Sequence, residues 1–288
     1  MIDLPTAEIS DFPDHPFKVR MDEEMEQMVE SVREWGVLSP VLVRPMPDGS
    51  YQMVSGHRRK FASELAELPT VPCIVRELTD DEAIIIMVDS NLQRERVLPS
   101  EKAFAYKMKL DAMRRQTGRP SKNNSVPVGQ NFGQTSREVL ASNSPDSNTQ
   151  IQRHIRLTNL VPELLDMVDN SVLKEKGTLQ MALRPAVELS YLPENEQNAL
   201  LEVMESEDCT PSHAQAIKIR DFSEKGKLNP DVILSIMQEE KPNQVKQFKI
   251  PRNRIDKFFP AGTPAQKIED TIVKALEMYR RRERAMER

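Results

Sequence analysis

The sequence predicts an α+β protein built from a small α/β unit, an all-α domain and a short β–α element at its end. Over residues 1–115, segments with the polar–apolar alternation of strands follow segments with helical periodicity, as in a small mixed α/β domain. Proline, glycine and asparagine accumulate over residues 116–134, and this composition is typical of a linker. Helical periodicity fills residues 135–242, and residues 243–288 combine an extended segment with one amphipathic helix.

Composition and charge exclude several classes of protein. Of the 288 residues, 38% are hydrophobic and 30% are charged. The longest apolar run, residues 83–88, is far too short to cross a bilayer, and the first residues lack the pattern of a secretion signal. Cys73 and Cys209 lie far apart, without the spacing of a zinc site. We therefore expect a cytoplasmic protein with no membrane partner, whose net charge of −5 still allows local basic surfaces for nucleic acid.

Each expected element of the first unit is based on a local signal. Apolar residues that include Met25 repeat at helical spacing, and Gly36 provides a stop, which predicts the first helix with Trp35 and Met25 in the core. Two strand-like runs flank a Pro-Asp-Gly turn and predict a hairpin. A capping box opens a helix at Thr79, and Pro99 opens the next. The expected elements are helices over 22–35 and 56–67, strands over 41–44, 51–54 and 71–75, a helix from Thr79, and a helix from Pro99 to about Arg115.

The end of the chain differs from the helical region before it. Residues 248–255 have an extended pattern, and a capped helix begins at Thr263. One face of that helix carries apolar residues at helical spacing, namely Ile268, Ile272, Leu276 and Tyr279. We expect this stripe to form a homodimer, and packing onto the chain's own body is the alternative.

Two capping boxes lie close together in the all-α domain and predict a helix-turn-helix over residues 136–159. Thr135 begins the first box and Ser147 the second, with a Ser-Pro-Asp turn between the two helices. Leu140 on the first helix can pack against Ile151 on the second. This arrangement leaves the leading turns of the second helix exposed.

Those leading turns carry the side chains that we expect to read DNA. Amides and guanidinium groups recognise adenine and guanine edges in the major groove. Acidic residues, which would repel phosphate, do not occur between positions 148 and 160. A helical hairpin with a polar outer face is the alternative interpretation. The predicted DNA-binding residues are Asn148, Thr149, Gln150, Gln152 and Arg153.

Three short segments of the first unit carry a combined pattern. Residues 36–44 contain Gly-x-x-x-Pro, residues 55–62 contain Gly-His-Arg-Arg, and residues 90–95 contain Asn-x-x-Arg. In order and spacing, and together with the helix start at Pro99 and the helix-turn-helix, they resemble the ParB partition family over roughly residues 1–170. The resemblance implies that the first segment holds the cytosine end of CTP, the second grips the triphosphate, and the third completes the phosphate and metal site. The implied nucleotide-binding residues are Gly36, Pro40, Arg44, Gly56, His57, Arg58, Arg59, Asn91 and Arg94.

Elementary chemistry agrees with the resemblance at the second segment. Gly56 at a helix start lets a phosphate approach the backbone, and the free N–H groups there favour an anion. Arg58 and Arg59 add fixed positive charge with a fork geometry that suits phosphate oxygens. Without the resemblance, the same residues would be a basic helix start on a solvated surface.

Two residues depart from the family's pattern. The family's glutamate after the glycine is His57 here, and its glutamate before the asparagine is Ser90. Those carboxylates are the natural groups for placing magnesium and an attacking water. We therefore expect CTP binding, with Asn91 as a ligand of Mg, and at most weak CTP hydrolysis, and we assign no catalytic residue.

The resemblance implies a CTP-gated dimeric clamp on double-stranded DNA that finds a short palindromic site and acts in chromosome, plasmid or mobile-element segregation. It further implies a ParA-type ATPase as partner and a place on the nucleoid. A second hypothesis is a transcriptional regulator of a mobile element that keeps the fold without CTP switching. A third is a sulfiredoxin-like ATP-dependent enzyme, since the first unit also resembles that fold. That hypothesis needs a cysteine nucleophile, which residues 55–58 lack.

Overall fold

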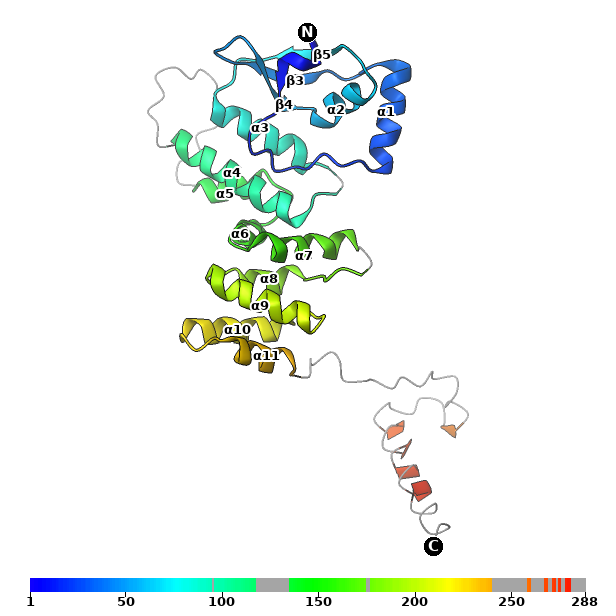
Figure 1. Ribbon diagram of the computed structural model, residues 1–288, viewed down its shortest axis with the longest axis vertical. Coiled ribbons are helices and arrows are strands. Elements are labelled where there is room, and N and C mark those ends of the chain that lie inside the picture. The colour runs from blue at the N-terminus through cyan, green and yellow to red at the C-terminus, as the bar shows by residue number, and fades with distance from the viewer. Residues whose placement is uncertain are drawn as a thin grey trace. The chain divides into compact units, whose positions relative to one another are not determined.

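The computed structural model describes residues 1–94, 96–117, 135–174 and 177–239, with short stretches at 258–259, 267–268, 271–272, 274–275 and 278–280. The chain forms two compact units, Met1–Glu239 and Glu240–Arg288. Figure 1 shows the first unit as a sheet with covering helices, followed by a succession of further helices. From residue 118 onward, the predicted linker lies outside the described residues.

A mixed sheet lies at the centre of the N-terminal part, with the described strands in the order β1-β5-β3-β4-β2. The strands are β1 Ile2–Pro5, β2 Ile9–Ser10, β3 Val41–Pro45, β4 Tyr51–Ser55 and β5 Thr70–Val75. The predicted hairpin is confirmed, because β3 and β4 pair antiparallel and Ser50 donates its N–H to Asp48 Oδ1 at 2.9 Å in the turn. β5 lies parallel to β3, as a crossover through α2 allows. The edge strands β1 and β2 were not predicted, because each is too short to show alternation.

The helices of this part begin where local signals predict. They are α1 Glu23–Trp35, α2 His57–Leu65, α3 Asp80–Leu92 and α4 Pro99–Thr117, with a short 3-10 turn at Thr6–Glu8. Asp22 accepts the N–H of Met25 at 2.8 Å at the start of α1, and Thr79 forms the predicted capping box of α3. Met25 is fully buried as expected. The prediction for Trp35 was wrong: its side chain is 66% exposed, because the last turn of α1 extends beyond the core.

Behind α4 the described chain is helical, as predicted. The helices are α5 Ser136–Ser142, α6 Asn148–Leu157, α7 Pro162–Leu173, α8 Leu183–Leu189, α9 Glu194–Ser206, α10 His213–Glu224 and α11 Pro230–Met237. Leu164, Leu189 and Leu200 are fully buried in the apolar cluster that these helices share. α6 packs on α8, α8 on α10 and α9 on α11, and Figure 1 shows the helices stacked in succession. This stack supports α6 from one side.

α4 joins the sheet region to the helices that follow. It contacts α3 on one side and α5, α6 and α7 on the other. Tyr106 of α4 is fully buried in the same core cluster as Leu140 and Ile151 of the helix-turn-helix. At the start of α4, Ser100 donates its N–H and its hydroxyl to the buried carboxylate of Asp169 on α7, at 2.9 and 2.5 Å. The predicted domain boundary therefore separates segments that share a core, and the division into domains stays a prediction.

The C-terminal unit is described at a few positions. Residues 267–268, 271–272, 274–275 and 278–280 are helical, in agreement with the predicted final helix. Ile268 is 8% exposed and Tyr279 is 63% exposed. Leu276 and the extended segment predicted over 248–255 lie outside the described residues, so dimerisation stays a prediction. Within the described ranges, none of the helices combines the length and apolarity needed to cross a membrane.

Candidate functional site

The start of α2 has the features of an anion-binding site. Gly56 is the residue before the helix and has a left-handed backbone, with φ 109° and ψ 19°. A Cβ atom at this position would lie 2.7 Å from Cγ1 of Val41, so both the conformation and the space require glycine. Among the residues that the structure describes, no side chain caps the helix. The Arg59 N–H donates to the carbonyl of Gly56 at 2.9 Å, and the first turn as a whole presents the positive end of the helix dipole.

Arg59 connects the start of α2 to the loop before β3. Its Nη1 donates to the carbonyl oxygens of Ser39 and Pro40, at 2.7 Å each. Burial lowers the pKa of the Arg59 guanidinium, which nevertheless stays charged at neutral pH. The first and second predicted segments, with Gly36 at the end of α1, thus lie together in the fold.

Arg58 and Arg94 bring further positive charge to the same region. Arg58 forms ion pairs with Asp22 and Glu24 at the start of α1, at 3.1 Å each. Arg94 follows α3 and lies over the ring of Phe17, 5.6 Å from the ring centroid. Burial lowers the pKa of Arg94, Glu101 acts in the opposite direction, and the charge of Arg58 lowers it further. Because Arg58 and Arg94 repel one another, an anion between them would relieve that repulsion.

His57 lies beside these arginines in a small cavity. The cavity has a volume of about 270 Å³ and is lined by Asp11, His15, Phe17, Val19, His57, Lys60, Phe61 and Glu64. The rings of His15 and His57 lie 3.8 Å apart between centroids. Both ring nitrogens of His57 are buried and have no hydrogen-bond partner among the described residues. Burial and the neighbouring His15 lower the pKa of His57 to about 3, so His57 is neutral at physiological pH.

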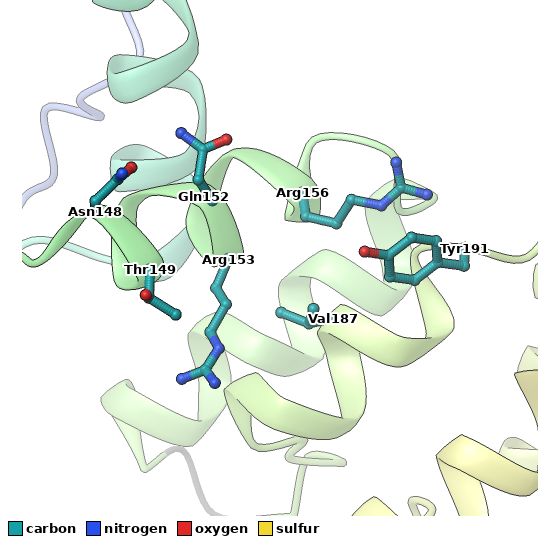
Figure 2. Close-up of a pocket in the computed structure, with 7 residues that line it drawn as sticks. All are labelled: Asn148, Thr149, Gln152, Arg153, Arg156, Val187 and Tyr191. Carbon is teal, nitrogen blue, oxygen red and sulfur yellow. The ribbon is translucent and has the colours of Figure 1, made fainter. Parts of the chain in front are cut away.

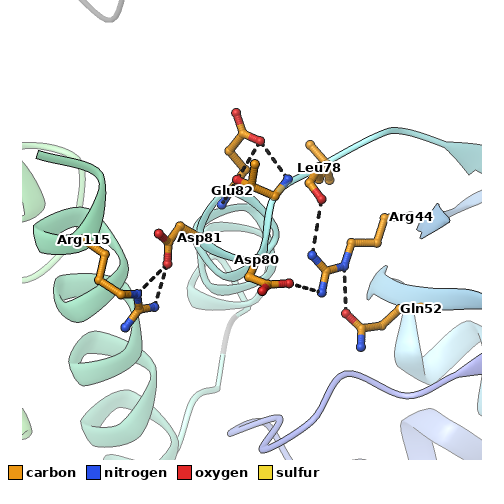
Figure 3. Close-up of polar contacts among 8 residues, drawn as sticks. Arg44, Gln52, Leu78, Asp80, Asp81, Glu82 and Arg115 are labelled. Atoms are coloured by element: carbon orange, nitrogen blue, oxygen red, sulfur yellow. Dashed lines mark hydrogen bonds and ion pairs between the residues drawn. The ribbon is translucent and has the colours of Figure 1, made fainter. Parts of the chain in front are cut away.

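Arg44 occupies a different place from the three arginines around α2. Its Nε donates to Gln52 Oε1 at 2.8 Å, its Nη1 donates to the carbonyl of Leu78 at 3.3 Å, and it pairs with Asp80 at 2.7 Å (Figure 3). The side chain is 6% exposed. The Arg44 guanidinium therefore connects β3 and β4 to the start of α3. Its predicted contact with a nucleotide gains no support from this geometry.

The third predicted segment is engaged within its own helix. Asn91 is buried, and its Nδ2 donates to the carbonyl of Met87 at 2.8 Å. Ser90 donates its hydroxyl to the same carbonyl at 3.0 Å. Asp89, a carboxylate close in sequence, pairs with Lys109 of α4, and Glu95 lies outside the described residues. Among the described residues, no group of three or more His, Cys, Asp or Glu side chains could hold a metal ion, so a magnesium site at Asn91 stays a prediction.

The predicted helix-turn-helix is present, and its turn is anchored to α4. Thr135 and Ser147 both form the expected capping boxes. In the turn, Asp146 accepts hydrogen bonds from Lys102 and Tyr106 of α4, at 2.8 Å each. Burial alone would raise the pKa of Asp146, but these two hydrogen bonds, together with the charges of Lys102 and His154, outweigh burial and lower the pKa. The turn is therefore held rigidly, which fixes the direction of α6.

A groove runs along α6 on its side next to α8. It has a volume of about 410 Å³ and is lined by Asn148, Thr149, Gln152, Arg153, Arg156, Val187 and Tyr191 (Figure 2). Asn148 and Thr149 are exposed, and Gln152 and Arg153 are half-buried. Gln150 differs from the other predicted residues, because its Oε1 accepts the N–H and the hydroxyl of Ser147 in the capping box, at 3.1 and 3.2 Å.

The sequence did not suggest Arg156, Val187 or Tyr191. Arg156 lies one turn after Gln152 and Arg153 on the same helix, so helical spacing could have added it to the set. Val187 and Tyr191 come from α8 and the residues just after it, and sequence contains no signal that brings them to α6. The groove thus combines four of the five predicted DNA-binding residues with an apolar and aromatic wall.

Comparison with known proteins agrees with the resemblance seen in the sequence. Residues 1–92 match the family described as the ParB N-terminal domain. The chain carries a ParB N-terminal domain. The chromosome-partitioning protein Spo0J of Thermus thermophilus is 32% identical over 205 residues, which are 71% of this chain and 65% of that protein. The chromosome-partitioning protein ParB of Caulobacter vibrioides is 43% identical over 105 residues, which are 36% of this chain and 34% of that protein. The chain therefore spans less than two thirds of the length of these relatives.

Two solved structures are also similar to this chain. One is a C-terminally truncated ParB of Caulobacter crescentus in complex with the centromeric parS site, with a TM-score of 0.41 and 24% identity, covering 83% of this chain and 100% of that chain. The other is the C-terminally truncated ParB of the same organism in complex with CTP-γ-S, with a TM-score of 0.31 and 28% identity, covering 70% of this chain and 96% of that chain.

Proposed function

We propose that this protein is a site-specific DNA-binding partition protein whose N-terminal domain binds CTP. The observation that carries the proposal is that a single compact unit holds both an arginine-lined, uncapped helix start and a rigidly held helix-turn-helix. α4 lies between the two and shares a core with the helix-turn-helix. The relatives that match the chain are named as chromosome-partitioning proteins.

The triphosphate of CTP would lie at the start of α2. The positive end of the helix dipole at Gly56 and the charges of Arg58 and Arg94 favour the phosphates. Arg58 would exchange Asp22 and Glu24 for phosphate oxygens, so part of the attraction replaces existing ion pairs. Arg59 holds the loop at Ser39 and Pro40 in place through its backbone contacts, and this loop is where the cytosine end would lie.

The residues around this site favour binding over hydrolysis. Positions 57 and 90 hold a histidine and a serine, so neither supplies a catalytic carboxylate. His57 is neutral, and the Ser90 hydroxyl donates to the carbonyl of Met87. We therefore propose that CTP acts as a switch, whose bound state closes two N-terminal domains of a dimer around DNA. The free energy for closure has to come from contacts that the nucleotide makes only in the closed state.

The DNA would be read by α6 in the major groove, with Asn148, Thr149, Gln152 and Arg153 facing the bases and phosphates. A dimer would present two copies of α6 and would therefore require a palindromic site. The magnesium ion, the ParA-type ATPase and the replicon to which the site belongs are further parts of this proposal that come from the family resemblance.

Crosslinking the protein to the chromosome in cells and sequencing the recovered DNA tests the proposal. A partition clamp gives a sharp site with enrichment that spreads over kilobases around it, and the spreading requires CTP binding. A variant with Arg58→Gln should keep the sharp peak and lose the spreading, whereas Arg76→Gln, which removes an exposed arginine of the same domain, should keep both. Absence of any enriched site in the wild type would overturn the proposal.

A static transcriptional regulator is the second candidate, and the neutral His57 at the position of the family's glutamate favours it. This candidate keeps α6 and its DNA site but binds no CTP. Titration of labelled CTP with and without the recovered DNA distinguishes the two functions. DNA binding without saturable CTP binding would support the regulator.

A further inference from the structure

An exposed tyrosine beside the α6 groove lies between two arginines. Tyr191 follows α8 and is 46% exposed. The Cζ atoms of Arg156 and Arg220 each lie 3.8 Å from the centroid of its ring. At this distance a guanidinium group lies against a ring face, and one face has no room for two such groups. Arg156 from α6 and Arg220 from α10 therefore occupy opposite faces of Tyr191.

The two arginines differ in how their charge is compensated. Arg220 pairs with Glu188 at 3.0 Å and with Glu224 at 2.8 Å, so two carboxylates surround its guanidinium. Arg156 donates its Nη2 to the neutral carbonyl of Ser190 at 3.0 Å. Within the described part of the chain, Arg156 has no ion pair, and its Nε is buried without a hydrogen-bond partner. Arg156 therefore keeps an uncompensated positive charge in a fixed position.

That charge lies at the groove from which the DNA would be read. Arg156 lines the groove together with Gln152 and Arg153, which lie three and four positions earlier on the same face of α6 (Figure 2). In Figure 2 the Arg156 side chain extends toward Tyr191, whereas Arg153 extends in a different direction. Arg156 is thus placed beside the predicted base-reading residues and held by the wall of the groove.

We propose that Tyr191 is a positioning residue that holds Arg156 as a binding site for a phosphate of the DNA backbone. The inference rests on the proposed function of α6 in DNA binding. Stacking on the ring keeps the guanidinium plane in one orientation and leaves donors at its edge for a phosphate oxygen. Because the side chain is ordered before DNA arrives, less conformational entropy is lost on binding. Arg220 supports the ring from its other face without adding net positive charge, since the two carboxylates of Glu188 and Glu224 offset it.

The salt dependence of DNA binding tests the role of Arg156. Fluorescence anisotropy of labelled duplex carrying the recovered site is measured from low to high salt for the full chain. Loss of one phosphate contact lowers the slope of log K against log salt by about 0.9, which corresponds to an affinity loss of about eightfold at 0.1 M salt. We expect this result for Arg156→Gln. Lys225→Gln, which removes one charge from an exposed position at the end of α10, is the matched control and should leave the slope unchanged.

Variants of Tyr191 test the positioning role. Tyr191→Phe keeps the ring and should bind DNA like the wild type, whereas Tyr191→Leu should lose affinity severalfold although no charge has been removed. Melting temperatures serve as a second readout, because a merely structural role would change thermal stability and leave the salt slope intact. The inference is overturned if Arg156→Gln weakens binding no more than Lys225→Gln, or if Tyr191→Leu binds like Tyr191→Phe. If the wild type itself binds no duplex at any salt concentration, the proposed function fails instead.

Discussion

Acidification should destabilise the N-terminal part of the protein through His57. The side chain is 6% exposed, and its pKa in the folded protein is about 3, compared with its ordinary value of 6.5. The unfolded chain therefore binds a proton at pH values where the folded chain does not. For a histidine whose pKa is depressed on folding, stability is complete above pH 6.5 and decreases as the pH falls toward 3.

The size of this effect follows from the pKa difference. Each pH unit within the window between the two pKa values costs about 1.4 kcal/mol of folding free energy. At pH 5, which is about 1.5 units below the ordinary value, His57 should therefore cost about 2 kcal/mol. Burial also lowers the pKa of His15 and His154, so both act in the same direction and add to the loss in the wild type.

Urea unfolding at pH 7 and pH 5 measures the effect, with far-UV circular dichroism as the probe. The helices of the N-terminal part, which contains His57, contribute to this signal. We expect His57→Gln to lose about 2 kcal/mol less than the wild type between the two pH values. His213→Gln, at an exposed position on α10, is the control and should follow the wild type. Equal pH dependence of the wild type and His57→Gln would refute the reasoning.

Further variants test other parts of the structure. Gly56→Ala should lower the free energy of unfolding in urea by about 1–3 kcal/mol, because the new Cβ would collide with Val41 of β3 and the left-handed backbone disfavours alanine. Unchanged stability would contradict the described helix start. Arg44→Ala should lower the free energy of unfolding by about 1–3 kcal/mol, because the buried Gln52 loses its donor, and should change CTP affinity little. A large loss of CTP affinity at unchanged stability would instead place Arg44 in the nucleotide site. Asp146→Asn should weaken the anchor of the turn and reduce DNA affinity severalfold in anisotropy, and wild-type affinity would show that α4 does not orient α6.

Features that depend on neighbouring residues were predicted well. The capping boxes at Thr79, Thr135 and Ser147 each involve positions three residues apart, so the sequence alone contains the interaction. The hairpin of β3 and β4 and the start of α2 at Gly56 are equally local. These signals sufficed to predict the α+β class and the helix-turn-helix.

Features that depend on distant partners were missed. β1 pairs with β5 about seventy positions away, and its four residues are too few to predict a strand from sequence alone. The guanidinium of Arg44 has Asp80 as a partner, which only the folded sheet brings near. Tyr191 meets Arg156 for the same reason, since α6 and α8 come together only through the shared core. Charge and residue type therefore identified candidate arginines, while tertiary packing decided where each one lies.

We propose that Arg58 and Arg94 together form the phosphate-binding part of a CTP site at the start of α2. Equilibrium binding of labelled CTP to the wild type, to the Arg58→Gln/Arg94→Gln double variant and to Arg76→Gln tests it most directly. Each charged hydrogen bond to phosphate contributes about 1.5–3 kcal/mol, so the double variant should bind at least about a hundredfold more weakly. Arg76→Gln should bind like the wild type. Equal CTP affinity of the wild type and the double variant would contradict the claim.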